Sequence, residues 1–297
     1  MSERFGLDLG SDQGGRLVKD RWFASLRLLL AGRAARDLPP TPDGGRWLLR
    51  WAGVCALVLA TLYLACGYHA GFLRLNAVAA GYPPLLWECL TSLGDERLAF
   101  ALTLVFSLRH PRLFWGLALA ALMGVLYSRG LKELFDSARP PAVLAADAFH
   151  LIGEGHRHAS FPSGHSVTVA VFCGVLIHHA RLSEWRWLLL LIAILVGLSR
   201  VAVGVHWPVD VAAGLMGGAL AAWLGTRLAA RWPGPATDPR AHLALVALAA
   251  ALACSLLWDD GGYPGAAGMR RWIGVLALLS AAGHYLLWPL VRRDRAG

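Results

Sequence analysis

The sequence predicts an all-α fold in which a bundle of helices spans a membrane. Hydrophobic residues make up 57% of the 297 residues and only 16% are charged, whereas an ordinary soluble domain carries about 25% charged residues. The mean hydropathy is +0.51. The apolar residues fall in blocks that approach the roughly 20 residues a helix needs to cross a bilayer. These observations exclude a disordered chain, a fibrous protein and a typical soluble domain.

The apolar blocks predict eight membrane-spanning helices. The second block is the weakest, because Asp95, Glu96 and Arg97 stand at its start. We expect the first six helices to form a membrane core over residues 51–231, and the last two to form a C-terminal transmembrane pair within residues 232–297. The blocks lie near residues 51–69, 92–108, 113–131, 166–182, 187–205, 208–230, 242–258 and 272–291.

Residues 1–50 precede the first block and are predicted to form a cytoplasmic segment. Residues 17–36 mix Trp, Phe and Leu with Lys and Arg, which is typical of a helix on an anionic membrane surface or of a tail tethered near it. Prolines within residues 37–45 predict a linker that ends any such helix. No clean apolar stretch precedes a small-residue cleavage site here. We therefore expect the first spanning helix to direct insertion itself.

The net charge of +9 is explained by membrane topology rather than by a nucleic-acid partner, since the basic residues lie between apolar blocks and form no stripe beside aromatic residues. With the N-terminus in the cytoplasm, 19 of the 28 Lys and Arg residues fall on the cytoplasmic side and nine on the other. The positive-inside rule favours this orientation, with both termini cytoplasmic. The five cysteines include no C-x-x-C pair, so neither a disulfide framework nor a zinc site is predicted.

Three polar clusters interrupt the apolar pattern, and the charge bias places all three on the outer face. The first follows the third block and contains Lys132 and Arg139, which a continuous helix would aim along one side, because seven residues make about two turns. The second contains Ser163, Gly164 and His165 just before the fourth block, where free backbone N–H groups form a natural anion site. Taken separately, span-end cations and a capped helix with a surface His explain both clusters.

The third cluster joins the fifth and sixth blocks and contains Arg200, His206 and Asp210. Arg200 lies near the end of an apolar run, where a charge is costly and usually functional. Pro208 fits the first turn of a new helix, and Asp210 can accept a hydrogen bond from one imidazole nitrogen of His206. Taken separately, a structural His–Asp pair explains this cluster, and Trp207 fits a place beside the site or at the membrane interface.

Together the clusters place three permanent cations, a helix N-terminus, two imidazoles and one carboxylate on one membrane face. That set fits phosphoryl transfer, in which positioning and neutralisation of three equatorial oxygens supply most of the catalysis. The clusters hold too few carboxylates for Mg²⁺ or for a two-metal site. The sequence therefore predicts a reaction that needs no metal and no other cofactor.

The same residues resemble the signature motifs of the type 2 phosphatidic acid phosphatase superfamily, K-x6-R-P, P-S-G-H and S-R-x5-H-x3-D, which this sequence matches in order at every fixed position. The resemblance covers roughly half the chain, from about the second to the sixth block. It implies a membrane-bound lipid phosphate phosphatase, with substrates of the phosphatidate, phosphatidylglycerol phosphate or undecaprenyl diphosphate type. In a bacterium the site would face the periplasm from the inner membrane.

The resemblance also implies a role for each matched residue. His206 would be the nucleophile that forms a phosphohistidine, Asp210 would orient it, and His165 would act as general acid and then as base. The phosphoryl oxygens would be bound by Lys132, Arg139, Arg200, Ser163 and the backbone N–H of Gly164.

Three alternatives stay open. A lipid A phosphatase or phosphotransferase would use the same residues with a different substrate or acceptor, and vanadium haloperoxidases carry similar motifs but are soluble. A lipid transporter or scaffold could retain the anion site without any chemistry. The C-terminal pair, which contains no polar cluster, could support an oligomer, shape the lipid entrance or add a packing surface, and the sequence does not fix the oligomeric state.

Overall fold

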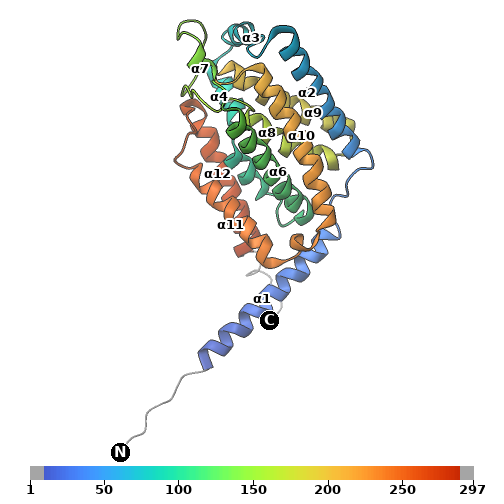
Figure 1. Ribbon diagram of the computed structural model, residues 1–297. Helices are drawn as coiled ribbons and strands as arrows, with labels where there is room; N and C mark the ends of the chain where they lie inside the picture. The colour runs from blue at the N-terminus through green and yellow to red at the C-terminus, as the bar shows by residue number, and fades with distance from the viewer. Residues whose placement is uncertain (1–9, 288–297) are drawn as a thin grey trace, which may run out of the picture.

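The computed structural model describes residues 10–287 of the chain, and side chains from residue 21. Within this range every regular element is a helix, as predicted (Figure 1). The α-helices are α1 Gly10–Ala34, α2 Gly44–Cys66, α3 Phe72–Ala79, α4 Pro84–Ser92, α5 Glu96–Thr103, α6 Pro111–Phe135, α7 Pro140–Val143, α8 Gly164–His179, α9 Ser183–Ala202, α10 Pro208–Arg231, α11 Pro239–Ser255 and α12 Ala267–Ala282. Three short turns, η1 Gly234–Ala236, η2 Pro264–Ala266 and η3 Gly283–Leu287, complete the list.

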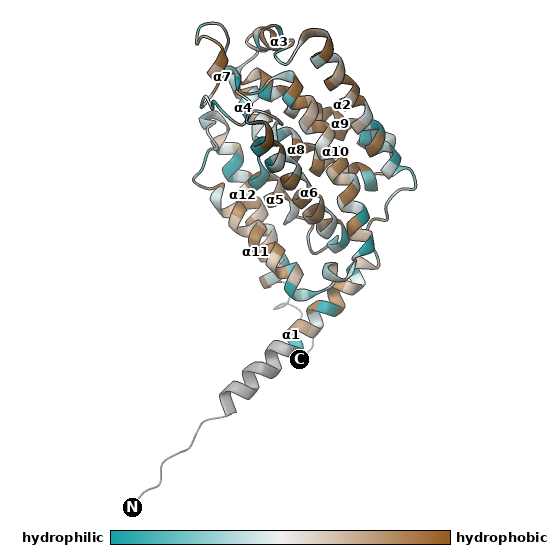
Figure 2. Cartoon of the chain, in the orientation of Figure 1, coloured by the Kyte–Doolittle hydropathy of each residue, from teal (hydrophilic) through white to brown (hydrophobic). Residues whose placement is uncertain are grey.

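Four helical stretches are long and apolar enough to cross a membrane by length and composition. They are α2, the stretch Pro111–Val143 that begins with α6, α9 and α10, while α8 and α11 are apolar but shorter. Figure 2 shows brown, apolar ribbon along these helices and more hydrophilic ribbon near their ends. The chain is therefore an integral membrane protein, although the eight predicted blocks do not all form full-length spanning helices.

The second predicted span, residues 92–108, is wrong as a single helix. Helix α4 ends at Ser92 and α5 begins only at Glu96. The break arises because the side chain of Asp95 accepts a hydrogen bond from the backbone N–H of Arg97 at 2.8 Å and so caps α5. The charged residues that weaken the apolar pattern are thus a helix-start signal within the block.

The N-terminal helix α1 extends away from the rest of the bundle (Figure 1). Its last turns pack against the core, where Leu26 and Leu30 form a buried cluster with Leu108. The predicted proline linker ends α1, but α2 begins at Gly44, seven residues before the predicted first span. Residues 1–9, and the end of the last predicted block beyond residue 287, lie outside the described residues. Attachment of α1 to a membrane surface stays a prediction.

Helix α10 lies at the centre of the bundle and contacts α2, α6, α8 and α9. Small residues on α10 permit this packing. A Cβ atom added at Gly218 would lie 2.5 Å from the carbonyl oxygen of Val167 in α8. Because α8 and α10 approach so closely, their N-terminal ends meet, and the backbone N–H of Ser163 donates to the carbonyl of Asp210 at 3.1 Å.

Helices α11 and α12 pack against each other and against α5 on one side of the bundle (Figure 1). The buried contact joins Leu98 of α5, and Leu104 directly after it, to Ala249 and Ala253 of α11 and to Ala277 of α12. Short side chains on α11 and α12 let the helices lie close together, so the C-terminal pair is attached to the core mainly through α5.

Candidate active site

The three polar clusters meet at one end of the bundle, where α6 and α9 end and α8 and α10 begin. Lys132 donates from Nζ to the carbonyl oxygen of Ala159 at 2.7 Å, and Arg139 donates to the same oxygen at 3.3 Å. The two cations therefore share one acceptor, although they lie in different segments of the chain.

The prediction that one helix carries Lys132 and Arg139 is wrong. Helix α6 ends at Phe135, and Asp136 adopts a left-handed backbone conformation with φ of 32°. Arg139 precedes Pro140, whose ring disfavours helical geometry at the residue before it. The chain therefore turns after α6, and this turn brings Arg139 back toward the end of the bundle.

The His206–Asp210 pair lies where α10 begins, and Pro208 occupies the first turn as predicted. His206 is 1% exposed, and its Nδ1 lies 3.2 Å from Oδ2 of Asp210. Oδ2 also accepts the backbone N–H of Trp207 at 2.9 Å. Because an ionised carboxylate only accepts hydrogen bonds, Nδ1 carries the proton and Nε2 keeps its lone pair.

Two residues that bind Asp210 were not predicted from the sequence. Tyr68 donates its hydroxyl to Oδ1, and Ser160 donates its hydroxyl to Oδ2. Burial and the Asp210 charge raise the pKa of Tyr68, so its hydroxyl stays protonated and remains a donor. Ser160 is the first residue of the predicted second cluster, where it has no predicted role, but Tyr68 follows α2 and belongs to no motif. A polar aromatic residue at the end of the first apolar block was the only signal for Tyr68.

The cations are buried close to one another. Arg139 is 9% exposed and donates to the carbonyl of His158 at 2.8 Å. Arg200 is 3% exposed and donates from one terminal nitrogen to the hydroxyls of Thr91 and Tyr263. Its buried Nε has no hydrogen-bond partner among the described residues.

The same cations act on the imidazole of His206. Burial lowers its pKa well below the ordinary value, and the charges of Arg139, Arg200 and Lys132 lower it further. His165 contributes in the same direction. These charges favour the neutral imidazole of His206, which is the form that can donate a lone pair to an electrophile.

The second cluster starts α8, as predicted. The Ser163 hydroxyl oxygen accepts from the backbone N–H of Ser166 at 3.4 Å and from its hydroxyl at 2.9 Å. Gly164 and His165 then occupy the first turn of α8 and line a cavity. Helix-start geometry leaves backbone N–H groups free to bind an anion at this position.

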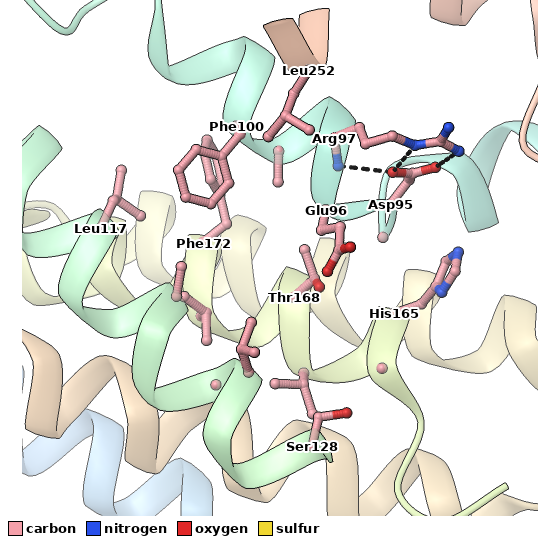
Figure 3. Close-up of a pocket in the computed structure, with 18 of the residues that line it drawn as sticks. Asp95, Glu96, Arg97, Phe100, Leu117, Ser128, His165, Thr168, Phe172 and Leu252 are labelled. Carbon is pink, nitrogen blue, oxygen red and sulfur yellow. Dashed lines mark hydrogen bonds and ion pairs between the residues drawn. The ribbon is translucent and has the colours of Figure 1, made fainter. Parts of the chain in front are cut away.

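The cavity has a volume of about 690 Å³ and is lined mostly by apolar side chains from α5, α6 and α8. Lys132 and His165 lie at its polar part, and Leu117 of α6 lies at its apolar part. Lys132 and Leu117 are 15 residues apart, which is about 22 Å along a helix. Figure 3 shows Phe100 and Phe172 beside Leu117 and away from His165. The cavity therefore joins the polar cluster to the apolar interior over much of a bilayer's depth.

Trp207 is buried inside the protein beside the site. It is 1% exposed, stacks on His69 with ring centroids 4.0 Å apart, and donates from Nε1 to the carbonyl of Ala138 at 2.9 Å. Among the residues with described side chains, no group of three or more His, Cys, Asp or Glu could hold a metal ion. Metal independence itself stays a prediction.

Parts of this chain are similar to known proteins. An undecaprenyl-diphosphatase of Sulfolobus acidocaldarius is 40% identical over 75 residues, which cover 25% of this chain and 35% of that protein. A lipid A 1-phosphatase of Rhizobium johnstonii is 39% identical over 97 residues, covering 30% of this chain and 36% of that protein. The crystal structure of Aquifex aeolicus LpxE matches this chain with 27% sequence identity and a TM-score of 0.46. The match covers 52% of this chain and 92% of the LpxE chain.

This chain spans about a third of the length of the two curated relatives. The model of the PAP2 superfamily matches residues 112–233. That segment contains all three polar clusters, from Lys132 to Asp210. Residues 112–233 of this chain are therefore similar to the PAP2 superfamily.

Proposed function

We propose that this protein hydrolyses a membrane lipid phosphate or diphosphate without a metal, through a phosphohistidine on His206. The observation that carries the proposal is that the charges of Lys132, Arg139 and Arg200 act on the buried imidazole of His206, while Lys132 and His165 line an apolar cavity. Lipid phosphates have the matching chemistry, with an anionic group attached to a long apolar chain.

In the first step, Nε2 of His206 attacks phosphorus and the bond from phosphorus to the lipid oxygen breaks. Asp210 holds the Nδ1 proton and stabilises the positive charge that develops on the ring. His165 gives a proton to the leaving oxygen, so that the lipid departs as an alcohol or a monophosphate.

In the second step, His165 takes a proton from water, and the resulting hydroxide attacks phosphorus. The bond from phosphorus to Nε2 breaks, inorganic phosphate leaves, and both imidazoles return to their starting state. Throughout, Lys132, Arg139 and Arg200 neutralise the phosphoryl oxygens. Ser163 and the backbone N–H of Gly164 supply further donors at the start of α8.

The cavity is proposed to hold part of the lipid chain. Replacing Thr168, which lines the cavity, by Trp is expected to displace about two methylene groups of the chain, or about 1.6 kcal/mol of burial, and to raise KM for a long-chain lipid phosphate about tenfold. The KM for water-soluble p-nitrophenyl phosphate should stay within about twofold, because that substrate has no chain to bury. Thr168→Val is the matched control. Equal effects on both substrates would show that the chain lies elsewhere.

The charge distribution supports a site that faces outward from a bacterial inner membrane, with both termini in the cytoplasm. The opposite end of the bundle carries the basic residues that flank the spans on the predicted cytoplasmic side, such as Arg109, Arg112, Arg181 and Arg186. The names of the two curated relatives favour undecaprenyl diphosphate and lipid A as substrates to test first.

The proposal is tested by phosphate release from the purified full-length protein across undecaprenyl diphosphate, lipid A, phosphatidate and phosphatidylglycerol phosphate. We expect release from at least one lipid that is unchanged by EDTA, with His206→Ala as the inactive control. Loss of activity in EDTA that Mg²⁺ restores would contradict metal independence. Transfer of phosphate to a second lipid in place of release would identify a phosphotransferase, and no turnover of any lipid would contradict an enzymatic function.

A further inference from the structure

We propose that the C-terminal helix pair, which lies outside the PAP2 match at residues 112–233, completes the phosphoryl site through Tyr263. In this proposal Tyr263 is a positioning residue that fixes the guanidinium of Arg200. The inference rests on the proposed function and gives the loop between α11 and α12 a defined role in it.

Tyr263 comes from that loop and is 6% exposed. Its hydroxyl accepts a hydrogen bond from NH1 of Arg200 at 2.9 Å, and the Thr91 hydroxyl accepts from the same nitrogen. The carbon at the centre of the guanidinium lies 5.9 Å from the centroid of the Tyr263 ring, within the range of a cation–π interaction. One corner of the guanidinium is therefore held from two sides.

Holding NH1 determines which edge of Arg200 is free. An arginine side chain binds two oxygens of a phosphate most strongly through a pair of parallel N–H donors. The Nε atom is buried and has no partner among the described residues, and a buried donor without an acceptor is uncommon in folded proteins. A phosphoryl oxygen would satisfy it, so the edge with Nε is the one left for substrate.

The loop that carries Tyr263 is fixed to the start of α5 by a network of ion pairs. Arg270 of α12 is 1% exposed and donates to Asp95 at 2.9 Å and to the carbonyl of Asp259 at 3.2 Å. Arg97 donates to the carboxylates of both Asp95 and Asp259. Asp95 and Arg270 are buried, so each requires its partner to keep its place. The position of the loop is therefore set from the core side as well as from α12.

The Tyr263 ring also supports the segment between Arg200 and His206. It forms a buried cluster with Val203 and Val205, and with Ala266 of η2. This short segment joins the third cation to the proposed nucleophile, and Tyr263 contacts it at Arg200 and packs with Val203 and Val205. A role limited to oligomer formation or to general packing would not require a hydroxyl aimed at Arg200.

The test is a double-mutant cycle in the full-length protein. Tyr263→Phe removes the acceptor oxygen and keeps the ring, and we expect kcat/KM to fall about tenfold, as for loss of one hydrogen bond to a charged group. In an Arg200→Ala background the same change should alter the residual activity less than about twofold, since nothing remains to position. Tyr82→Phe, at a tyrosine that is 55% exposed in an outer loop, should match the wild type.

Thr91→Val provides a second variant, because it removes the other acceptor on NH1 without touching the C-terminal pair. We expect a loss of similar size, again absent in the Arg200→Ala background. Equal losses in both backgrounds, or no loss from Tyr263→Phe in the wild-type background, would overturn the proposal.

Binding of orthophosphate separates this inference from the proposed function. We expect phosphate to raise the unfolding temperature of the wild type, and Tyr263→Phe to need about tenfold more phosphate for the same shift. If the wild type hydrolyses a lipid phosphate and His206→Ala does not, while Tyr263→Phe binds phosphate like the wild type, the inference fails alone. If no lipid is hydrolysed but phosphate binding still depends on Tyr263 and Arg200, the anion site stands and the proposed reaction fails.

Discussion

Replacing His206 by Ala is expected to lower kcat at least a thousandfold, which corresponds to about 4 kcal/mol of activation free energy. The substitution removes the only imidazole whose Nδ1 is held by Asp210 among the described residues. It should leave the fold intact, because Asp210 keeps hydrogen bonds from Tyr68, Ser160 and the backbone N–H of Trp207. No buried carboxylate is left unpaired by the substitution. The fall in kcat would therefore come from the missing nucleophile and not from unfolding.

The intermediate can be trapped to check this result directly. A substrate with a labelled phosphoryl group should leave label on the wild-type protein that is lost in acid and survives alkali, as expected for a phosphorus–nitrogen bond. The His206→Ala variant should carry no label. His158→Ala is the matched control, since His158 is an exposed histidine in the loop before α8. Label on His206→Ala at the wild-type level would place the nucleophile at another residue.

The residues of the candidate site could be proposed from the sequence because each cluster sits where an apolar block begins or ends. Pro208 and Asp210 mark the start of α10, and Ser163 marks the start of α8, through local hydrogen bonds that depend on residues a few positions apart. Helix-start signals of this kind can be recognised from the sequence alone. The charge bias then placed the clusters on one face without any knowledge of packing.

Contacts between distant segments could not be predicted in this way. Tyr68 is 142 residues from Asp210, and Tyr263 is 63 residues from Arg200. Neither pairing follows a helical period, because each depends on how the ends of separate helices meet. The proposed role of the C-terminal pair likewise depends on a contact that is seen only when the loop between α11 and α12 is placed beside α9.

Two helices predicted from the sequence were wrong, each because of one residue with a specific backbone requirement. The average composition of residues 92–108 is apolar. Asp95 nevertheless caps α5 and forms ion pairs with Arg97 and Arg270, so a new helix starts inside the block. The spacing of Lys132 and Arg139 fits a helix, but Pro140 prevents one. In both places a single residue with a specific backbone requirement outweighs the average composition of its neighbours.

Replacing His165 by Ala is expected to lower kcat about a thousandfold for a lipid monophosphate, within the range for loss of a general acid–base group. His165 lines the cavity in the first turn of α8, and the hydrogen bonds of the described residues include none to its ring. Gly94 packs against it, since a Cβ added there would lie 2.8 Å from the Cβ of His165. Gly94 thus restrains His165 at its Cβ, and the side chain lines the cavity.

The leaving group distinguishes this role from a structural one. A lipid alkoxide needs a proton to depart, whereas p-nitrophenolate is a stable anion and leaves without one. With p-nitrophenyl phosphate, His165→Ala should therefore form the phosphohistidine at a rate close to that of the wild type, and then accumulate it, because no base activates water in the second step. The measurement is a burst of nitrophenol accompanied by acid-labile label on the protein. An equal loss with both substrates and no trapped label would instead mean that His165 supports the site without transferring a proton.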